Sequence, residues 1–363
     1  MATTITTTLP DIMLTSSIPD IYFTSDESQV NVSVTVNGVD VFSETYYTFR
    51  RYVQMHDLGE IVENAMRSSF SPLAECELRA NDQSMRFTAL LCLREGPMSC
   101  LSMLQQNFLT SRKTKVLPPD SVDLLHCIVL DREHRLLKID IYFRQDGKPD
   151  VQHLFTVEEP SDRFNDGYSH FIKTVSTFQL LDLLAQKYPM HRDFELLYAT
   201  YRINDRSFTY YFSKERTDYS LYFLNVYGCL ELVSFNATTK AKTKVTKQTA
   251  FSNRQMSFYD ETLEKTYDVE IANLASEDAE WLEEVFISPD VGMPSRPITA
   301  EDDEFDTFDR ILITDCTCEA QDGDTELNKV KFSWRRSSQR LPASFTDLSF
   351  YRIHTAPFNH PFT

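Results

Sequence analysis

Alternation of apolar and polar residues, interrupted by turn dipeptides, is the feature that most constrains the fold of this 363-residue chain. Residues 30–36 read Val-Asn-Val-Ser-Val-Thr-Val and run directly into Asn37-Gly38. Asn-Gly suits a type I′ turn because both central residues need a positive φ, and a period of two places the valines on one face of a strand. The segment therefore predicts a β-hairpin, with its second strand at residues 39–46.

The same arrangement recurs along the chain. Four further turn signals stand between alternating segments: Asn81-Asp82, Gln145 to Lys148, Asn204-Asp205 and Asp322-Gly323. The last of them leads into residues 329–335, where Val330, Phe332 and Trp334 share one face. Such a series predicts antiparallel meanders.

Helical signals are few. Asp57-Leu58-Gly59-Glu60 has the spacing of a capping box, and Ser276 is expected to cap a second helix whose first turn is acidic. Residues 179–187 are too continuously apolar to decide between strand and helix. We therefore predict a mainly β protein made of several antiparallel β-sandwich modules of the immunoglobulin-like kind, with a few short helices.

Connections rich in proline and polar residues divide the chain near residues 120, 225 and 295. We expect a β-rich domain with one short helix at 1–120 and an antiparallel β domain at 121–225. A β-hairpin plus a short helix should follow at 226–295. The C-terminal β segment, 296–363, could pack with 226–295.

The sequence also indicates where the chain is made. No lysine or arginine precedes Arg50, and the longest apolar run is Ala89 to Leu93. We therefore expect no signal peptide and no membrane insertion, with synthesis in the cytoplasm. The seven cysteines form an odd set in a large chain, which fits a reducing compartment better than a disulfide framework.

Sequence motifs for catalysis and cofactors are absent. Glycine occurs only eight times, with no two closer than 20 residues, which excludes glycine-rich phosphate loops and the nucleophile elbow. The eight histidines show no metal-ligand spacing, and Cys316-x-Cys318 has no second pair nearby. We predict that the chain is not an enzyme and has no catalytic residues, cofactor or metal. Its ligand-binding residues stay undefined.

Charge narrows the choice of partners. A formal net charge of −18 opposes the phosphate backbone, so no nucleic acid is expected. Residues 235–260 hold five bases against one acid, and residues 261–310 hold 16 acids against three bases. Two such faces could meet head to tail between subunits, or they could simply be solvated, with lysines that protect a strand edge. The candidate assembly interface consists of Lys240, Lys242, Lys244 and Lys247.

Aromatic residues make up 12% of the chain and include Tyr46-Tyr47, Tyr210-Tyr211 and Tyr219 to Tyr227. Exposed rings at these positions could stack on sugars. Rings inside the sheets would instead form core contacts and cross-strand pairs. A carbohydrate-binding role therefore depends on which of these tyrosines face solvent.

Four short sequence segments, taken in order along the chain, resemble segments of known proteins. They are Asn107-Phe-Leu-Thr110, Asn225-Val-Tyr-Gly-Cys-Leu-Glu231, Ser276-Glu-Asp-Ala-Glu-Trp-Leu-Glu-Glu-Val-Phe-Ile-Ser288 and Lys331-Phe-Ser-Trp-Arg-Arg336. Together they resemble β-rich proteins of gut Bacteroidales and of their phages and prophages, associated with tails or other virion parts. The resemblance spans most of the chain from about residue 10, and it brings no active site.

The resemblance implies a non-enzymatic structural component of a phage or prophage-derived particle. Its partners would be other copies of itself and other particle proteins. It would be made in the bacterial cytoplasm and be located in the virion once it has assembled. The alternative is a β-sandwich module that binds carbohydrate or a cell surface, with a glycan as its partner.

Overall fold

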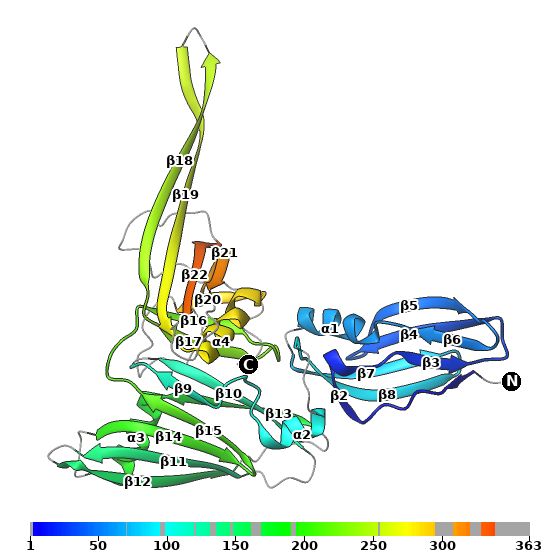
Figure 1. Ribbon diagram of the computed structural model, residues 1–363, viewed down its shortest axis with the longest axis horizontal. Coiled ribbons are helices and arrows are strands. Elements are labelled where there is room, and N and C mark those ends of the chain that lie inside the picture. Colours follow the sequence, from blue (N-terminus) through cyan, green and yellow to red (C-terminus); the bar gives the residue numbers. More distant parts are fainter. Residues whose placement is uncertain are drawn as a thin grey trace.

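The structure is a computed structural model in which three β-rich bodies and one long projecting hairpin can be distinguished (Figure 1). It describes residues 3–69, 71–94, 99–119, 121–130, 136–145, 148–160, 168–189, 194–252, 255–294, 308–319 and 328–337. Most of these residues lie in strands, arranged in several mainly antiparallel sheets, and four α-helices accompany them in the described part. The predicted mainly β fold class is confirmed.

Two sheets share the core of the N-terminal body. One has the order β1 (Thr4–Ile5), β3 (Ile21–Thr24), β6 (Tyr52–Met55), and the other β2 (Ile12–Leu14), β8 (Gln83–Leu90), β7 (Leu73–Ala80), β4 (Gln29–Val36), β5 (Val39–Tyr47). Valines of β4 pack against Phe23 of the first sheet, and helix α1 (Leu58–Ser69) adds Leu58, Val62 and Met66 to the core. A short 3₁₀ helix, Thr15–Ser17, lies beside α1.

Two predicted turns in this body are confirmed. Asn37 and Gly38 have φ values of 50° and 77° and join β4 to β5, and Asn81, with φ of 49°, joins β7 to β8. Gly59 has a different reason to be glycine, because a Cβ there would lie 2.5 Å from the Thr15 carbonyl oxygen. The close approach of α1 to the 3₁₀ helix therefore requires a residue without a side chain.

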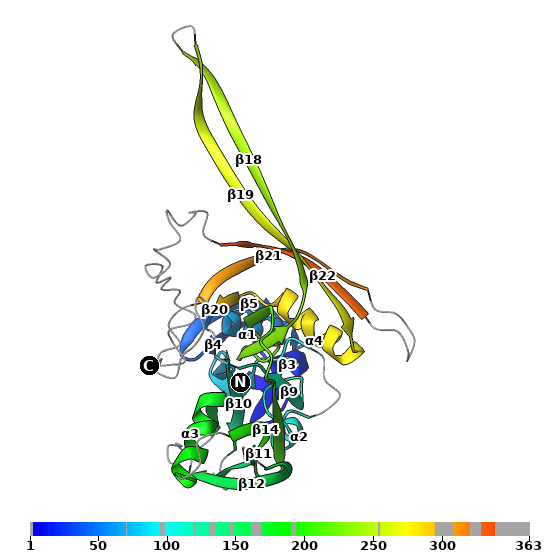
Figure 2. The same cartoon turned by 90° about the vertical axis from the view of Figure 1, so that its left-hand side faces the viewer.

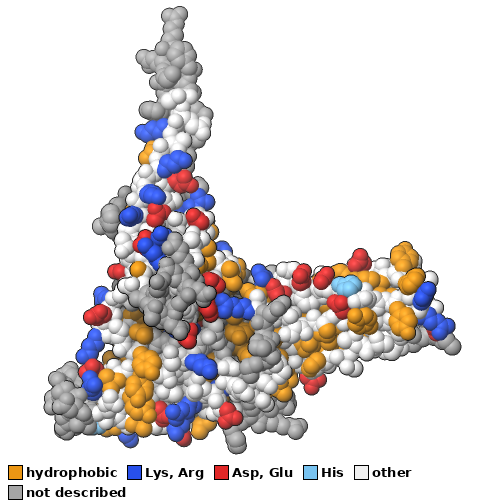
Figure 3. Space-filling view, viewed as in Figure 1, with side chains coloured by type: hydrophobic (Ala, Val, Ile, Leu, Met, Phe, Trp, Pro, Cys, Tyr) orange, Lys and Arg blue, Asp and Glu red, His pale blue; other side chains and the backbone are white. Residues whose placement is uncertain are grey.

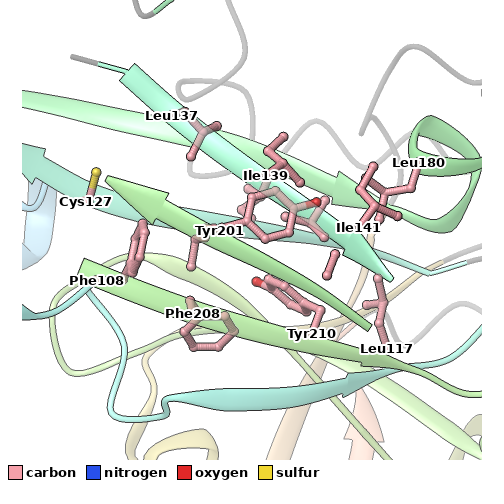
Figure 4. Close-up of a cluster of buried hydrophobic side chains, with 14 of the residues drawn as sticks. Phe108, Leu117, Cys127, Leu137, Ile139, Ile141, Leu180, Tyr201, Phe208 and Tyr210 are labelled. Atoms are coloured by element: carbon pink, nitrogen blue, oxygen red, sulfur yellow. The ribbon is translucent and has the colours of Figure 1, made fainter. Parts of the chain in front are cut away.

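The central body is also built from two sheets. A pair, β10 (Val122–Val129) with β13 (Ser169–Ser176), shares a core with the five-stranded order β12 (Lys148–Pro160), β11 (Leu136–Gln145), β14 (Phe194–Ile203), β15 (Arg206–Phe212), β9 (Thr114–Leu117). Figure 4 shows Ile139, Ile141, Tyr201 and Tyr210 within this core. Helices α2 (Cys100–Gln106) and α3 (Thr177–Lys187) accompany it.

A seven-stranded sheet forms the third body. Its order is β17 (Leu230–Phe235), β16 (Tyr219–Leu224), β20 (Val291–Pro294), β21 (Phe308–Glu319), β22 (Asn328–Arg336), β19 (Gln255–Leu274), β18 (Thr238–Ser252). Strands β21 and β22 arch over helix α4 (Ser276–Ile287) (Figure 2). Leu282 and Val285 of α4 pack with Val330 and Phe332 of β22, so the helix fills the hollow of the curled sheet.

Two of the sheets draw on strands from both sides of the expected domain boundaries. Strand β9, expected within 1–120, pairs in parallel with β15 of the central body. Strand β16 precedes residue 225 yet belongs to the third sheet, together with β21 and β22 from 296–363. Strand β2 also pairs in parallel, with β8. These pairings join distant segments, so no local signal announces them.

The helix predicted after Asp57 does begin at Leu58, but the cap predicted for α4 is misplaced. Ser276 is the first residue of α4 rather than its cap: Ala275 occupies the cap position, and Ser276 Oγ accepts a hydrogen bond from Asn328 Nδ2 at 3.1 Å. The prediction that Ser276 caps the helix is wrong. Asp57, before α1, has a φ of 60°, outside the extended conformation that a capping residue normally adopts.

The undecided segment at 179–187 is helical. It lies in α3, whose cap is Ser176, with its side chain accepting from the Gln179 backbone N–H at 3.2 Å. The predicted pairings across Gln145 to Lys148 and Asn204-Asp205 are confirmed by β11–β12 and β14–β15. Asp146, Gly147 and the turn at Asp322-Gly323 lie outside the described residues, although the flanking strands β21 and β22 do pair.

Candidate functional site

A two-stranded ribbon projects far beyond the seven-stranded sheet (Figures 1 and 2). We call it the arm and define it as residues 242–252 of β18 and 255–266 of β19. These residues pair with each other, whereas pairing between β19 and β22 starts only at Tyr267 opposite Trp334. At roughly 3.3 Å per residue, the arm extends about 35 Å from the sheet.

All four predicted interface lysines lie on β18, and their side chains are exposed. Across the hairpin, Lys240 lies opposite Asp268, Lys244 opposite Glu264 and Lys247 opposite Glu261. Figure 3 shows basic and acidic side chains interspersed along the lower part of the arm. The structure thus brings the basic segment against the first acids of the following acidic segment, within one chain.

One of these lysines makes a direct ion pair. Lys242 Nζ lies 2.5 Å from Asp268 Oδ2, and Ser333 Oγ donates to the other oxygen of this carboxylate at 2.9 Å. The hydrogen bond from Lys242, together with that from Ser333, lowers the pKa of Asp268. Exposed pairs of this kind contribute about 0–1 kcal/mol, so they orient the strands rather than hold them together.

Aromatic stacking anchors the base of the arm. The rings of Tyr267 and Trp334 stack with centroids 4.2 Å apart, and Lys265 Nζ lies 5.2 Å from the Tyr267 ring centroid. Arg335 Nη1 bonds to Glu264 Oε1 at 2.9 Å just beyond the last β19–β22 pair. These contacts fix the root of the arm, and the strand pairing that the structure describes beyond it is between β18 and β19.

Strand β18 is an edge of the sheet. Among the residues that the structure describes, β19 is its only neighbour in the strand order, so half of its backbone N–H and C=O groups face away from the sheet. Val245 and Leu263 form an exposed apolar pair opposite each other on the arm. An exposed edge with apolar and charged side chains can accept a further strand from another chain, and lysines restrict which strand is accepted.

A second feature is a buried ionic cluster that the sequence did not reveal. Lys115 Nζ of β9 lies 2.8 Å from both Asp123 Oδ2 of β10 and Glu231 Oε1 of β17. Burial alone would lower the pKa of Lys115, but the two carboxylates outweigh it and the pKa is raised. The sequence does contain a local signal for this cluster. Asp123 and Glu231 each interrupt an otherwise apolar strand, in Val-Asp-Leu-Leu and Leu-Glu-Leu-Val.

Hydrogen bonds occupy both carboxylates of this cluster. Asp123 accepts from Tyr210 OH at 2.9 Å and from the backbone N–H groups of Leu124 and Leu232, each at 2.9 Å. Glu231 accepts from Thr110 Oγ1 at 2.8 Å and Asn225 Nδ2 at 2.6 Å. Since all three charged side chains are buried, the cluster has the geometry of a structural clasp between the central and third bodies.

Helix α4 is attached beside the clasp. Glu284 is buried, and its Oε2 accepts a hydrogen bond from the Val226 backbone N–H at 3.4 Å. Arg94 Nη1 lies 3.4 Å from the other carboxylate oxygen, Oε1. Burial, and next the charge of Glu231, raises the pKa of Glu284. This carboxyl group therefore links α4 to the N-terminal body through Arg94 and to the turn before β17.

Exposed aromatic side chains gather at a tight turn of the N-terminal body. Tyr47, Phe49 and Tyr52 are 75%, 73% and 65% exposed, and they flank Arg50 and Arg51, which both have positive φ. We call these five residues the aromatic tip. Of the other tyrosines that the sequence singled out, Tyr210, Tyr219 and Tyr222 are buried, whereas Tyr211 is exposed.

A shallow groove of about 1240 Å³ lies between β7 and β8 on one side and α2 on the other. Arg86 Nε lies 3.2 Å from Glu77 Oε1 in this groove, and Asp11 and Glu75 also line it. Cys316 and Cys318, the metal candidates from sequence, lie on β21 without forming a ligand set within the described ranges.

Comparison with known protein families and curated proteins identifies no relative of this chain. A scan against protein-family models finds no match, and a search of curated proteins finds none either. Among the helices that the structure describes, none is long and apolar enough to cross a bilayer.

Proposed function

We propose that this chain is a non-enzymatic structural component of a phage or prophage-derived particle, and that it acts through protein–protein assembly. The single observation that carries the proposal is the arm. It pairs only with itself among the described residues, and it projects away from every hydrophobic core of the molecule.

The energetics of the arm favour a partner. Fixing the backbone of one residue costs about 1–2 kcal/mol, and an isolated two-stranded ribbon in water buries too little apolar surface to offset this. Residues 240–249 are all exposed in the free chain. Contact with a second copy, or with another particle protein, would bury this surface and stabilise the ribbon.

The arm also fits a specific mode of contact. Strand β18 offers an unpaired backbone edge, and Lys240, Lys242, Lys244 and Lys247 line it with positive charge. A strand with acidic side chains could add to this edge, so that backbone hydrogen bonds supply affinity and charge supplies register. The chain as a whole is strongly acidic, so another copy of it meets the charge requirement.

Reversing charge on the arm should weaken assembly. We expect Lys242→Glu with Lys244→Glu to reduce self-association in analytical ultracentrifugation, most strongly at low salt, because screening is least there. Lys187→Glu with Lys214→Glu changes the net charge equally at exposed sites elsewhere and should leave association intact.

A charge swap distinguishes a contact between Lys242 and a partner from an effect of Lys242 on the hairpin itself. Lys242→Glu with Asp268→Lys keeps an ion pair inside the hairpin but removes positive charge from β18. If the lysine contacts a partner, the swap should assemble as poorly as Lys242→Glu alone. Full recovery by the swap would show that the lysines act only on the hairpin itself.

The alternative function, binding of carbohydrate or a cell surface, is favoured by the aromatic tip. Three exposed rings beside two arginines can stack on sugar faces and bond to hydroxyl or acidic groups. In this case a glycan array should show saturable binding that Tyr47→Ala with Tyr52→Ala removes and Tyr211→Ala retains. A blank array would end this alternative.

A further inference from the structure

Two paired strands and one turn bring three metal-ligating side chains together. His126 lies on β10 and His170 on β13, two register positions apart on the paired strands, and Cys229 ends the turn before β17. His126 Nδ1 and His170 Nε2 are 3.0 Å apart, and one ligand atom from each of His126, His170 and Cys229 lies within 4.8 Å of the other two. These residues stand 44 and 103 positions from His126 in the sequence, so no spacing motif announces them.

Hydrogen bonds to residues outside the cluster orient His126 and the turn that carries Cys229. His126 Nε2 bonds to the Leu230 carbonyl oxygen at 3.0 Å, which makes Nε2 the protonated nitrogen and directs the lone pair of Nδ1 toward His170. Metal-bound histidines characteristically donate their second N–H to such a carbonyl. The Asn225 side chain accepts from the backbone N–H of Cys229 at 3.1 Å, and this fixes the turn that presents the thiol.

We propose that His126 Nδ1, His170 Nε2 and Cys229 Sγ form a binding site for a late transition-metal ion, with Zn²⁺ as the ion to test. Imidazole and thiolate ligands select zinc or copper over magnesium and calcium. With Zn–N near 2.0–2.1 Å, two nitrogens on one tetrahedral zinc stand about 3.3 Å apart, close to the 3.0 Å found here. Water would take the fourth position.

Binding has a definite proton balance. In the metal-free chain His170 donates its Nε2 proton to His126 Nδ1, and Cys229 is a thiol. When the metal binds, the hydrogen bond between the histidines breaks, His170 carries its proton on Nδ1, and the thiol proton is released to solvent. One proton therefore leaves for each Zn²⁺ bound, and no redox change is involved.

The location suggests a clamp rather than a catalytic centre. His126 and His170 belong to the central body, whereas Cys229 leads into β17 of the third sheet. A metal at this point would join the two bodies beside the buried ionic cluster. His170 is the half-buried member and gives the ion its approach. Zinc should therefore raise the melting temperature of the full chain, because a ligand that binds only the folded state stabilises it.

The test uses the full chain carrying Cys316→Ser and Cys318→Ser, which removes the exposed thiols. After treatment with a chelator, this protein should bind one Zn²⁺ in calorimetry. With Co²⁺ it should develop a thiolate-to-metal charge-transfer band. The additional change Cys229→Ser should abolish the band and weaken Zn²⁺ binding by more than the about 10–100-fold that loss of an outer-shell partner costs.

Cys76→Ser is the matched control, because Cys76 and Cys229 are both 2% exposed and Cys76 lies in the N-terminal core. It should keep the band and the affinity. His170→Asn offers a second variant at a half-buried site, and circular dichroism reports whether each variant is folded. No binding by the parent protein, or a cobalt band that persists in folded Cys229→Ser or His170→Asn, would overturn the proposal.

Discussion

Replacing residues 243–265 with Asn-Gly should abolish incorporation of the chain into particles while leaving its body folded. Lys242 and Thr266 are partners in the hairpin register, so a two-residue type I′ turn can close the shortened ribbon. All pairs between β19 and β22 lie outside the deletion. The ion pair of Glu264 with Arg335 is lost, but it is exposed and contributes only about 0–1 kcal/mol.

The readout combines the melting temperature with the amount of chain that co-purifies with particles. A milder variant, in which Asn-Gly joins Val245 directly to Leu263, should retain part of the incorporation, because it keeps three further cross-strand pairs. Normal incorporation of the first variant would mean that the arm is not the element that assembles. A large fall in its melting temperature would mean instead that the arm stabilises the body.

Asp123→Asn should produce the largest loss of stability among single substitutions of similar size. The change preserves shape but removes the charge that faces Lys115, and it places a donor NH₂ group where Lys115 and Tyr210 both need an acceptor. Breaking a buried ion pair costs about 3–5 kcal/mol in the free energy of unfolding. Urea denaturation should therefore show a marked shift of the midpoint to lower concentration.

Asp26→Asn is the control for this substitution. Asp26 forms an ion pair with Arg51 at 3.2 Å, but the arginine is largely exposed, so the expected cost is about 0–1 kcal/mol. Equal effects of the two substitutions would contradict the role of Lys115, Asp123 and Glu231 as a clasp. A reduced denaturant slope for Asp123→Asn would instead indicate that the central and third bodies had separated before global unfolding.

Local signals in the sequence predicted the parts of the fold that depend on neighbouring residues. Asn37-Gly38 predicts its hairpin because the turn and the alternation of residues 30–36 are both local. The cap of α4 was misplaced because Ser276 and Ala275 are adjacent, and only the tertiary contact with Asn328 decides the role of the serine. Long-range pairing, such as β9 with β15, was beyond any local pattern.

In the arm and the buried ionic cluster, too, features set by neighbouring residues could be predicted, whereas those set by long-range contacts could not. Alternating lysines on an edge strand could be predicted from residues 240–247, but the acids opposite them follow from the register of β18 with β19. Lys115 and Glu231 are 116 positions apart and meet only in the folded chain. A charged residue inside an apolar strand, as at Asp123, is the signal that can identify such buried clusters.

Quantitative mass spectrometry of purified particles from the producing culture tests the central claim most directly. The copy number of this chain is measured against an abundant particle protein, for the natural chain and for the chain that lacks residues 243–265. A structural component that assembles through its arm predicts a fixed ratio for the natural chain and loss of the shortened chain. Absence of the natural chain from particles would contradict the claim and favour the carbohydrate-binding alternative.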